Sequence, residues 1–268
     1  MSLTALMASG PVIASGGEEF TGPTPGDFYQ PMWDLGFIEI TRPMLVLALV
    51  TVLACWIMLA GSRNASVVPS KGQFYFEQVY DFVRGGIARD MIGPNYRKYM
   101  PLLFGLFLFV LLSNLMASTP FIQNPPTARI AIPIVATAVV YVAYHYVGIK
   151  KHGLAGYFKF MVPKGLSPAM VPAIFVLEAA TYFLIRPLTL ALRLFGNLFA
   201  GHMLILVFVL GGEFLLFHDN WLFKFFSIGA FGMGFLMQVF EILIQALQAY
   251  VFTLLAASYI GTAEADEH

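Results

Sequence analysis

Apolar residues gather in long runs along this chain, and three of the runs have the length of one membrane crossing. They cover residues 43–61, 101–119 and 130–149, and none of them contains Asp, Glu, Lys or Arg. At about 1.5 Å of helical rise per residue, each run would extend roughly 28 to 30 Å, which matches the hydrocarbon core of a bilayer. We therefore predict three transmembrane helices.

Two longer apolar runs follow, at residues 169–212 and 225–261. A helix over the second run would be about 55 Å long, nearly twice the hydrocarbon thickness, so it must tilt strongly, bend or project from the membrane. The polar segment between the runs, with Glu213, His218 and Asp219, is expected outside. The pattern predicts an all-α polytopic membrane protein with about five crossings, whose last two helices are long, strongly tilted and form a hairpin.

The composition agrees with this class. Of the 268 residues, 59% are hydrophobic and 11% are charged, against about 25% charged residues in soluble domains. Fifteen basic and fifteen acidic residues give zero formal net charge, so nothing indicates a nucleic-acid partner. The single Cys55 excludes an intrachain disulfide, and the histidines lack the paired spacing of metal ligands. We expect no cofactor and no metal.

Basic residues alternate between the predicted loops. The first loop holds Arg63, Lys71, Arg84, Arg89, Arg97 and Lys98, the second only Arg129, and the third Lys150, Lys151, Lys159 and Lys164. By the positive-inside rule, the N-terminus is outside and the C-terminus is cytoplasmic. Residues 1–42 lack the basic start of a signal peptide and are expected to be an extracytoplasmic loop segment, followed by a single membrane domain over 43–268.

The first loop also contains an amphipathic pattern. Its apolar residues share one side of a helix: Phe76, Val79, Tyr80, Val83 and Ile87. Two interpretations stay open, a helix that lies on the membrane surface without a binding role, or a helix that docks a partner. At the other end of the chain, the acidic tail that begins at Glu264 is expected to be solvated.

Ionisable residues within the two long runs carry most of the functional information. They are Glu178, Arg186, Arg193 and His202 in the first run and Glu241 in the second. A charge at the centre of a membrane helix costs about 2.5 to 3.5 kcal/mol on insertion scales. Such residues usually face a partner or a water-filled path, so a functional role is the default hypothesis.

Helical geometry sorts these residues into two polar faces. Arg186, Arg193 and Asn197 lie within about 40° of one line on the first helix, beside small residues that admit a close neighbour. On the second helix a stripe consists of Gln238, Glu241, Gln245, Gln248 and Tyr259.

The two helices cross in opposite senses, which brings His202 and Glu241 to nearly the same depth. Both groups can exchange protons when their surroundings shift their pKa values. Simpler roles stay open: Arg186 extending to the interface, a structural His202–Glu241 hydrogen bond, and glutamines that only join helices. We expect His145, His152 and His218 to be interfacial or loop residues.

Two sequence motifs resemble one family. The stretch RPLTLALRLFGNLFAGH (186–202) closely resembles the signature of the a subunit of F-type ATP synthase, and EILIQALQAYVFTLLAASYIG (241–261) resembles the last helix of that family. The order of the spans fits as well, so the resemblance extends from about residue 43 to the end of the last helix. It implies a membrane stator that abuts a rotating c ring.

The resemblance also implies roles for individual residues. Arg193 matches the essential arginine that faces the c-ring carboxylate and keeps two half-channels apart, Gln248 matches a functional glutamine, and Asn197 and Arg186 match polar and basic positions. His202 and Glu241 match an interacting half-channel pair with the two residue types exchanged. Glu178 falls near an acidic position of the family, at an irregular spacing from Arg186. The remaining stripe residues are treated as accessory.

The resemblance implies the remainder of the F1Fo ATP synthase as partner, including the c ring and b-type peripheral stalk subunits, in a bacterial plasma membrane. The subunit would have no catalytic site of its own. The alternative is a self-contained ion channel or secondary transporter, which inverted internal repeats would favour. We find no such repeats, and no hydrolase motif occurs within the spans.

Overall fold

The computed structural model describes residues 31–34, 39–63, 69–119, 130–161, 167, 170–218 and 220–265. The predicted N-terminal segment and the predicted second loop therefore lie mostly outside the described residues. Contacts divide the chain into two compact units, which are described separately below. One unit includes residues 200–241 and the other includes residues 30–199 and 242–268.

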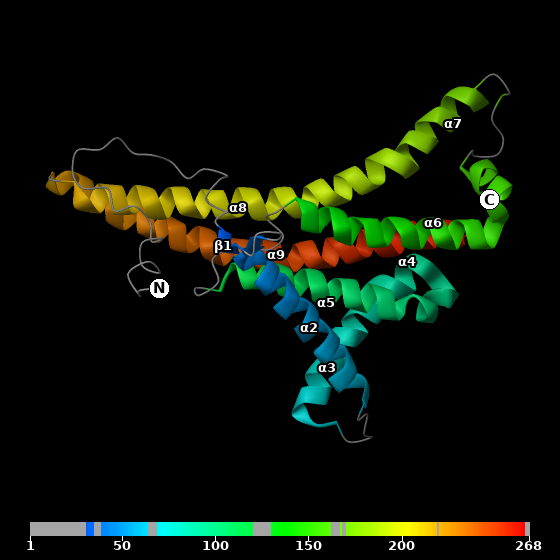
Figure 1. Cartoon of the computed structure of the whole chain (residues 1–268), viewed down its shortest axis with the longest axis horizontal. Helices are drawn as coiled ribbons and strands as arrows, with labels where there is room; N and C mark the ends of the chain where they lie inside the picture. Colours follow the sequence, from blue (N-terminus) through cyan, green and yellow to red (C-terminus); the bar gives the residue numbers. More distant parts are fainter. Residues whose placement is uncertain are drawn as a thin grey trace. The chain divides into compact units, whose positions relative to one another are not determined.

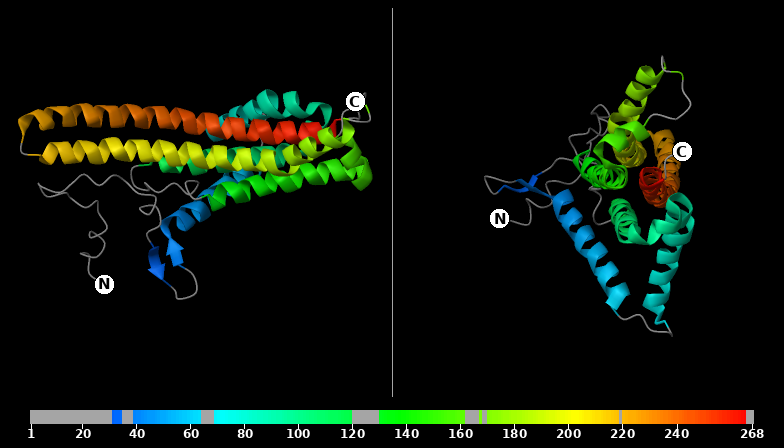
Figure 2. Two further views of the ribbon diagram at one scale, coloured as in Figure 1. Left: turned by 90° about the horizontal axis from the view of Figure 1, so that it is seen from above. Right: turned by 90° about the vertical axis from the view of Figure 1, so that its right-hand side faces the viewer.

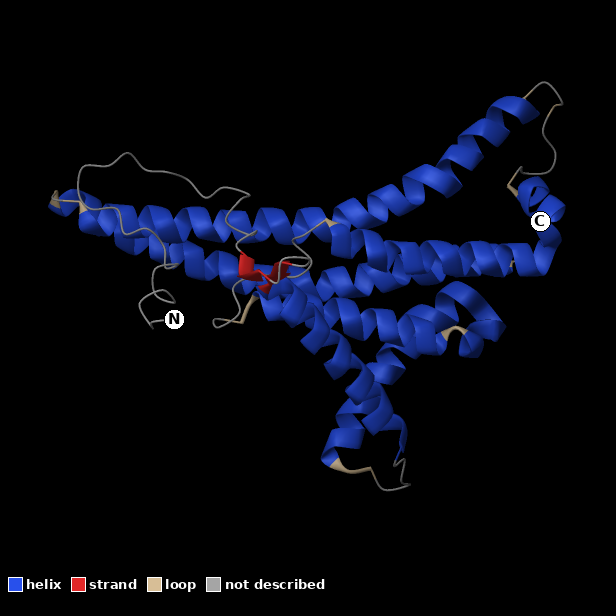
Figure 3. Ribbon diagram, in the orientation of Figure 1, coloured by secondary structure: helices blue, strands red, loops and turns tan. Residues whose placement is uncertain are grey.

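Helices make up nearly all of the described chain (Figure 3). In chain order (Figure 1) the elements are β1 (Pro31–Asp34), β2 (Glu39–Thr41), α2 (Arg42–Arg63), α3 (Lys71–Val83), η2 (Arg84–Arg89), α4 (Asp90–Ile92), η3 (Gly93–Lys98), α5 (Met100–Ala117), α6 (Ala131–Phe160), α7 (Val171–Ala180), η5 (Thr181–Ile185), α8 (Arg186–Phe217) and α9 (Trp221–Glu264). The symbols η2 and η5 denote π-helices, and η3 is a 3-10 helix.

The predicted fold class is confirmed. Among the described residues, four helical segments are long and apolar enough to cross a membrane, at 44–63, 131–160, 171–217 and 221–264, and α5 adds a shorter apolar helix. The elements α7, η5 and α8 follow one another without a break and form the third of these segments. The arrangement is that of a polytopic membrane protein with about five crossings.

The N-terminal loop prediction needs one correction. Residues 31–34 and 39–41 pair as a short antiparallel hairpin that leads directly into α2. A two-stranded ribbon of seven residues has too little regular alternation to be recognised in a segment rich in Gly and Pro.

The amphipathic helix of the first loop packs against its own chain. Ser70 caps α3 by accepting a hydrogen bond from the Gln73 backbone N–H at 3.3 Å. The rings of Phe76 and Tyr80 then meet Phe104 of α5 edge-on, with centroids 5.4 and 5.3 Å apart. The predicted apolar face is therefore covered by α5, so it is not the partner-docking surface that one interpretation required.

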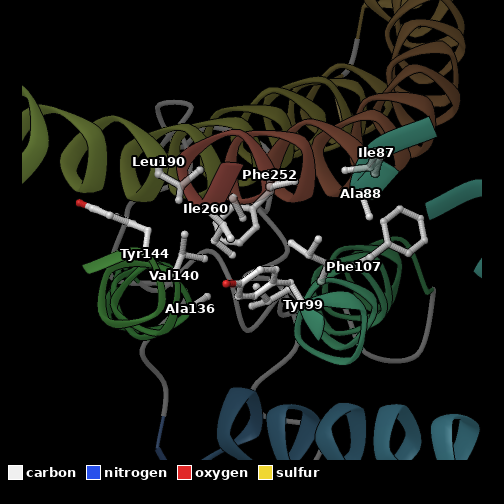
Figure 4. Close-up of a cluster of buried hydrophobic side chains, with 14 of the residues drawn as sticks. Ile87, Ala88, Tyr99, Phe107, Ala136, Val140, Tyr144, Leu190, Phe252 and Ile260 are labelled. Carbon is white, nitrogen blue, oxygen red and sulfur yellow. The ribbon is translucent and has the colours of Figure 1, made fainter. Parts of the chain in front are cut away.

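The core of the larger unit surrounds the C-terminal half of α9, which lies between α6 and α5 in Figure 1 and is seen end-on beside them in the right-hand view of Figure 2. Side chains from several elements meet there (Figure 4), and the labelled members include Ile87 of η2, Phe107 of α5, Val140 of α6, Leu190 of α8, and Phe252 and Ile260 of α9. Small residues let the helices approach closely, as expected where lipid supplies no hydrophobic drive for association.

The end of α6 folds back on itself. Gly153 has φ +70°, a backbone conformation that other residues rarely adopt, and it separates the two parts of the helix. The reversal lays the Tyr157 ring on Gly148, where a side-chain carbon would collide with it. The apolar run ending at residue 149 predicted the crossing but not this return.

Candidate functional site

Arg193 lies on α8 with its side chain exposed. Its neighbours Leu192 and Leu188 are 46% and 51% exposed, so the guanidinium emerges from an apolar surface. Neither a hydrogen bond nor an ion pair joins Arg193 to any other described residue. A lone cation on such a surface is costly unless something outside the chain neutralises it.

One position on the same helix leaves space near this arginine. A side-chain carbon added to Gly196 would meet nothing within 4 Å, and Asn197 is half-buried one turn away. The surface beside Arg193 can therefore receive another helix at short range.

Arg186, one of the predicted accessory residues, is held by aromatic rings. Its guanidinium carbon lies 3.7 Å from the ring centroid of Tyr182 and 5.0 Å from that of Tyr259. Its buried Nη1 has no hydrogen-bond partner among the described residues. The structure thus joins two of the predicted residues, Arg186 and Tyr259, through a cation–π contact rather than leaving the arginine extended to the interface.

A π-helical turn sets the direction of Arg186. The Arg186 backbone N–H donates to the carbonyl of Thr181 instead of that of Tyr182, which is the change from an i−4 to an i−5 bond. The Tyr182 carbonyl thereby loses its α-helical donor. The hydroxyl of Tyr144 on α6 donates to this carbonyl at 2.6 Å and takes the place of the lost bond.

The same turn explains the irregular spacing of Glu178. Eight residues of uninterrupted α-helix turn through about 800°, which would leave Glu178 and Arg186 about 80° apart. The π-turn takes up about one residue more than an α-turn, so the effective rotation is that of seven residues and the two side chains return to within about 20° of one line. Glu178 is half-buried there and forms no ion pair with a described residue.

The glutamines of α9 differ in their surroundings. Gln245 is 1% exposed, and its Oε1 accepts a hydrogen bond from the Ser118 hydroxyl at 2.8 Å, while its backbone carbonyl accepts from Asn114 Nδ2 at 3.3 Å. Gln245 therefore joins α9 to α5, as the packing interpretation expects. Gln248 is also buried, and the Nε2 atoms of both glutamines have no hydrogen-bond partner among the described residues.

In the unit that includes residues 200–241, both members of the predicted proton-exchanging pair are buried. His202 is 8% exposed and Glu241 is 5% exposed. A side-chain carbon at Gly201 would lie 3.3 Å from Cδ and Oε1 of Glu241, so the missing side chain is what admits the carboxyl group against α8. Gln238, one turn before Glu241, is half-buried.

One buried histidine contradicts the sequence interpretation. His145 is 9% exposed, and its Nδ1 is hydrogen-bonded to the Tyr157 hydroxyl at 2.8 Å, so it is a buried residue of α6 and does not lie in a loop. Its ring also stacks on Phe183 at 4.9 Å. The only sequence signal for this burial is Gly153, which permits the reversal that returns Tyr157 to His145.

The end of α9 is anchored to two other segments. The Glu264 carboxylate accepts from the Tyr99 hydroxyl at 2.6 Å and from Asn95 Nδ2 at 2.9 Å, and its backbone carbonyl accepts from Lys151. Burial and the carboxylate together raise the pKa of Tyr99 above its usual value. The solvated-tail expectation is therefore wrong for Glu264, while Asp266 and Glu267 lie outside the described residues.

The described residues offer several groups that can bind or exchange protons. No three His, Cys, Asp or Glu side chains of the described part gather in a way that could hold a metal ion. The larger unit provides an exposed cation, Arg193, on an apolar helix. The smaller unit provides a buried carboxyl group, Glu241, and a buried imidazole, His202.

Comparisons with known proteins agree with these features. The family described as "ATP synthase A chain" matches residues 44–261. A protein of a Nocardioides species named "ATP synthase subunit a" is 40% identical over 97% of this chain and 99% of its own length. A protein of the same name from a Parafrankia species is 41% identical over 96% of this chain and 88% of its own length. The chain therefore belongs to the bacterial ATP synthase a subunit family, membrane proteins of the Fo sector that serve proton transport and ATP synthesis.

Proposed function

We propose that this chain is the proton-translocating stator subunit of Fo and that Arg193 faces the carboxylates of a rotating c ring. The observation that carries the proposal is the exposed guanidinium of Arg193 on an apolar surface of α8, without a partner in the described chain. A carboxylate from another subunit is the group that would neutralise it. The open space beside Gly196 would let that subunit approach.

The chemistry of this encounter is a change in proton affinity. A c-ring carboxylic acid that arrives beside Arg193 is favoured in its ionised form, because an opposite charge in a low dielectric stabilises the anion. The acid therefore releases its proton to water. The anion must be protonated again before it can return to lipid, and the fixed charge of Arg193 blocks the direct route between the two events.

Two offset half-channels would supply and remove the protons. We assign His202 and Glu241 to the outer half-channel, since both are buried and both can carry a proton. Arg186, Tyr259 and Glu178 are assigned as accessory residues on the inner side. One charge that crosses 100 mV contributes about 2.3 kcal/mol, so each ATP requires several protons.

Asn197 and Gln248 complete the proposed arginine region. Asn197 lies one turn from Arg193, and the unpartnered amide of Gln248 can donate to water or to the c-ring carboxylate. In this proposal the N-terminus is outside and the C-terminus is cytoplasmic, and the direct partners are the c ring and b-type stalk subunits.

The experiment is the substitution Arg193→Ala in the assembled ATP synthase, with Leu192→Ala as the matched control on the same exposed surface. We expect Arg193→Ala to reduce ATP synthesis in inverted vesicles to background while the complex stays assembled, because the c-ring acid would no longer be driven to ionise. Leu192→Ala should retain at least half of the activity. Near-normal synthesis by Arg193→Ala, or proton conduction by the purified chain alone, would overturn the proposal.

A further inference from the structure

A groove on the segment between α2 and α5 has no role in the proposed proton path. Its volume is about 670 Å³, and the lining residues are Arg84, Arg89, Gly93, Pro94, Tyr96 and Arg97. Three arginines and no carboxylate line it. Like charges so close to one another favour an anionic ligand between them.

The backbone brings the arginines together. Gly93 has φ +78° and is followed by Pro94, and this turn ends α4 and starts η3 in a new direction. This turn brings Tyr96 and Arg97 back beside Arg84, which precedes Tyr96 by twelve residues in the chain.

Tyr96 orients two of the guanidinium groups. Its hydroxyl oxygen accepts from Nε of Arg84 at 3.2 Å and from Nε of Arg97 at 3.5 Å. These hydrogen bonds lower the pKa of Tyr96, with the bond from Arg97 as the larger cause. The Nη groups of Arg97 form no hydrogen bond or ion pair with a described residue, so they can donate to a ligand.

The acids near the groove do not cancel its charge. Asp81 contacts Nη1 of Arg84 at 3.5 Å, but both side chains are exposed, and such pairs contribute little. Arg89 has no ion pair within the described residues. The groove therefore keeps a positive field, and guanidinium groups suit phosphate because they donate two parallel hydrogen bonds.

The place of the groove along the chain favours a lipid as the source of that phosphate. The lining ends at Arg97, three residues before the start of α5, an apolar helix with Pro101 in its first turn, so the groove is expected at the level of the lipid headgroups. Met91, between Arg89 and Gly93 in the chain, is 40% exposed and provides an apolar surface for acyl chains. Basic pockets at membrane helix ends are suited to anionic headgroups.

We propose that this groove binds the phosphate group of an anionic phospholipid. The arginines hold the headgroup phosphate, and the neighbouring apolar side chains contact the start of the acyl chains. This site is independent of the proposed proton path, because none of its residues belongs to that path.

The test is photo-crosslinking in the intact ATP synthase complex, reconstituted in nanodiscs of phosphatidylcholine with a small share of photoreactive phosphatidylglycerol. Mass spectrometry quantifies the lipid attached to the segment 82–99. The substitutions Arg84→Gln, Arg89→Gln and Arg97→Gln together should lower this yield at least tenfold. A matched control that removes three exposed positive charges elsewhere (Arg63→Gln, Lys71→Gln and Lys159→Gln) should stay within twofold of the unsubstituted complex.

Two further variants cover the case in which the triple variant fails to assemble. Replacing the three arginines by lysine keeps the charge but removes the paired hydrogen bonds, so we expect about a threefold loss of yield. Tyr96→Phe frees the two guanidinium groups and should also lower the yield severalfold.

The outcomes separate the sources of an anion. Inorganic phosphate at 20 mM should leave most of the lipid labelling in place. Complete loss of labelling in its presence, together with direct phosphate binding in detergent, would assign the groove to free phosphate and overturn the lipid proposal. An equal loss of labelling in the matched control would show that the yield depends only on surface charge, and this would also overturn the lipid proposal. Unchanged labelling with loss of a protein subunit from the triple variant would assign the groove to a protein partner instead.

Discussion

Replacing Gly201 by alanine places a methyl group against the Glu241 carboxyl group. The new carbon would lie 3.3 Å from Cδ and Oε1 of Glu241, whereas ordinary contacts between carbon atoms are about 3.5 to 4.0 Å. The carboxyl group must therefore move by roughly 0.2 to 0.7 Å. Proton transfer requires a heavy-atom separation of about 2.6 to 3.2 Å, so a shift of this size spans the whole useful range.

The expected result is a loss of proton flux without loss of the fold. A misplacement of about 1 Å can lower a rate a hundredfold, so we expect Gly201→Ala to lower ATP-driven proton pumping in inverted vesicles about three- to tenfold. The matched control is Gly211→Ala on the same helix, where an added carbon would meet nothing within 4 Å. Both substitutions raise helix propensity by about 1 kcal/mol, so that contribution cancels in the comparison.

A compensating substitution makes the test sharper. Glu241→Asp in the Gly201→Ala background shortens the acid by one methylene and removes the collision, so part of the lost flux should return. Equal pumping by Gly201→Ala and Gly211→Ala would refute the reasoning. So would a double variant that is no better than Gly201→Ala, since the acid would then have no role that depends on its position.

Two further predictions concern the tyrosines. Tyr144→Phe removes the donor to the Tyr182 carbonyl and should lower the unfolding free energy of the detergent-solubilised chain by about 1 to 3 kcal/mol. The Tyr141 hydroxyl makes no hydrogen bond to a described residue, so Tyr141→Phe should have no such effect. Equal losses of unfolding free energy in the two variants would contradict the role of Tyr144. The two tyrosines can be distinguished in a phenol absorbance titration that compares the wild type with Tyr96→Phe and with Tyr99→Phe. Tyr96 should ionise below the usual tyrosine pKa of about 10, because hydrogen bonds from arginine favour its anion. Tyr99 should ionise above that value, because burial disfavours its anion. The stability that Tyr99 contributes to the folded chain is thus present below about pH 10 and declines as the pH rises through the raised pKa of Tyr99. Ionisation of both tyrosines at the same pH would contradict the environments described for them.

The number and nature of the membrane helices could be predicted because they depend on local composition. The run 43–61 needed only its apolar length, and α2 spans Arg42–Arg63. The reversal at Gly153 and the π-turn at 181–185 could not be predicted from the sequence, because each depends on a local backbone conformation that is stabilised by a residue elsewhere in the chain. Tyr157 returns to His145, and Tyr144 replaces the helical donor of Tyr182.

The candidate site divides in the same way. The isolation of Arg193 among apolar residues was readable from sequence, since no acid lies within a turn of it. The hydrogen bonds of Gln245 were not, because Asn114 and Ser118 lie more than 120 residues away along the chain and stand at the end of an apolar run with no periodic signal. The roles assigned to Arg193, His202 and Glu241 stay predictions until the substitutions are measured.

The π-turn between α7 and α8 changes how the lengths of relatives should be compared. A helix that contains such a turn differs from a regular helix by one inserted residue, and the insertion is absorbed locally instead of rotating everything after it. A relative that is one residue shorter between its counterparts of Glu178 and Arg186 would form an uninterrupted α-helix and still present both side chains in the same direction. Sequence alignments of this segment should therefore place a one-residue gap within 181–185. Deleting one residue there should leave Glu178 and Arg186 within about 20° of one line, whereas deleting one residue within α8 would rotate every helical residue after it by about 100°.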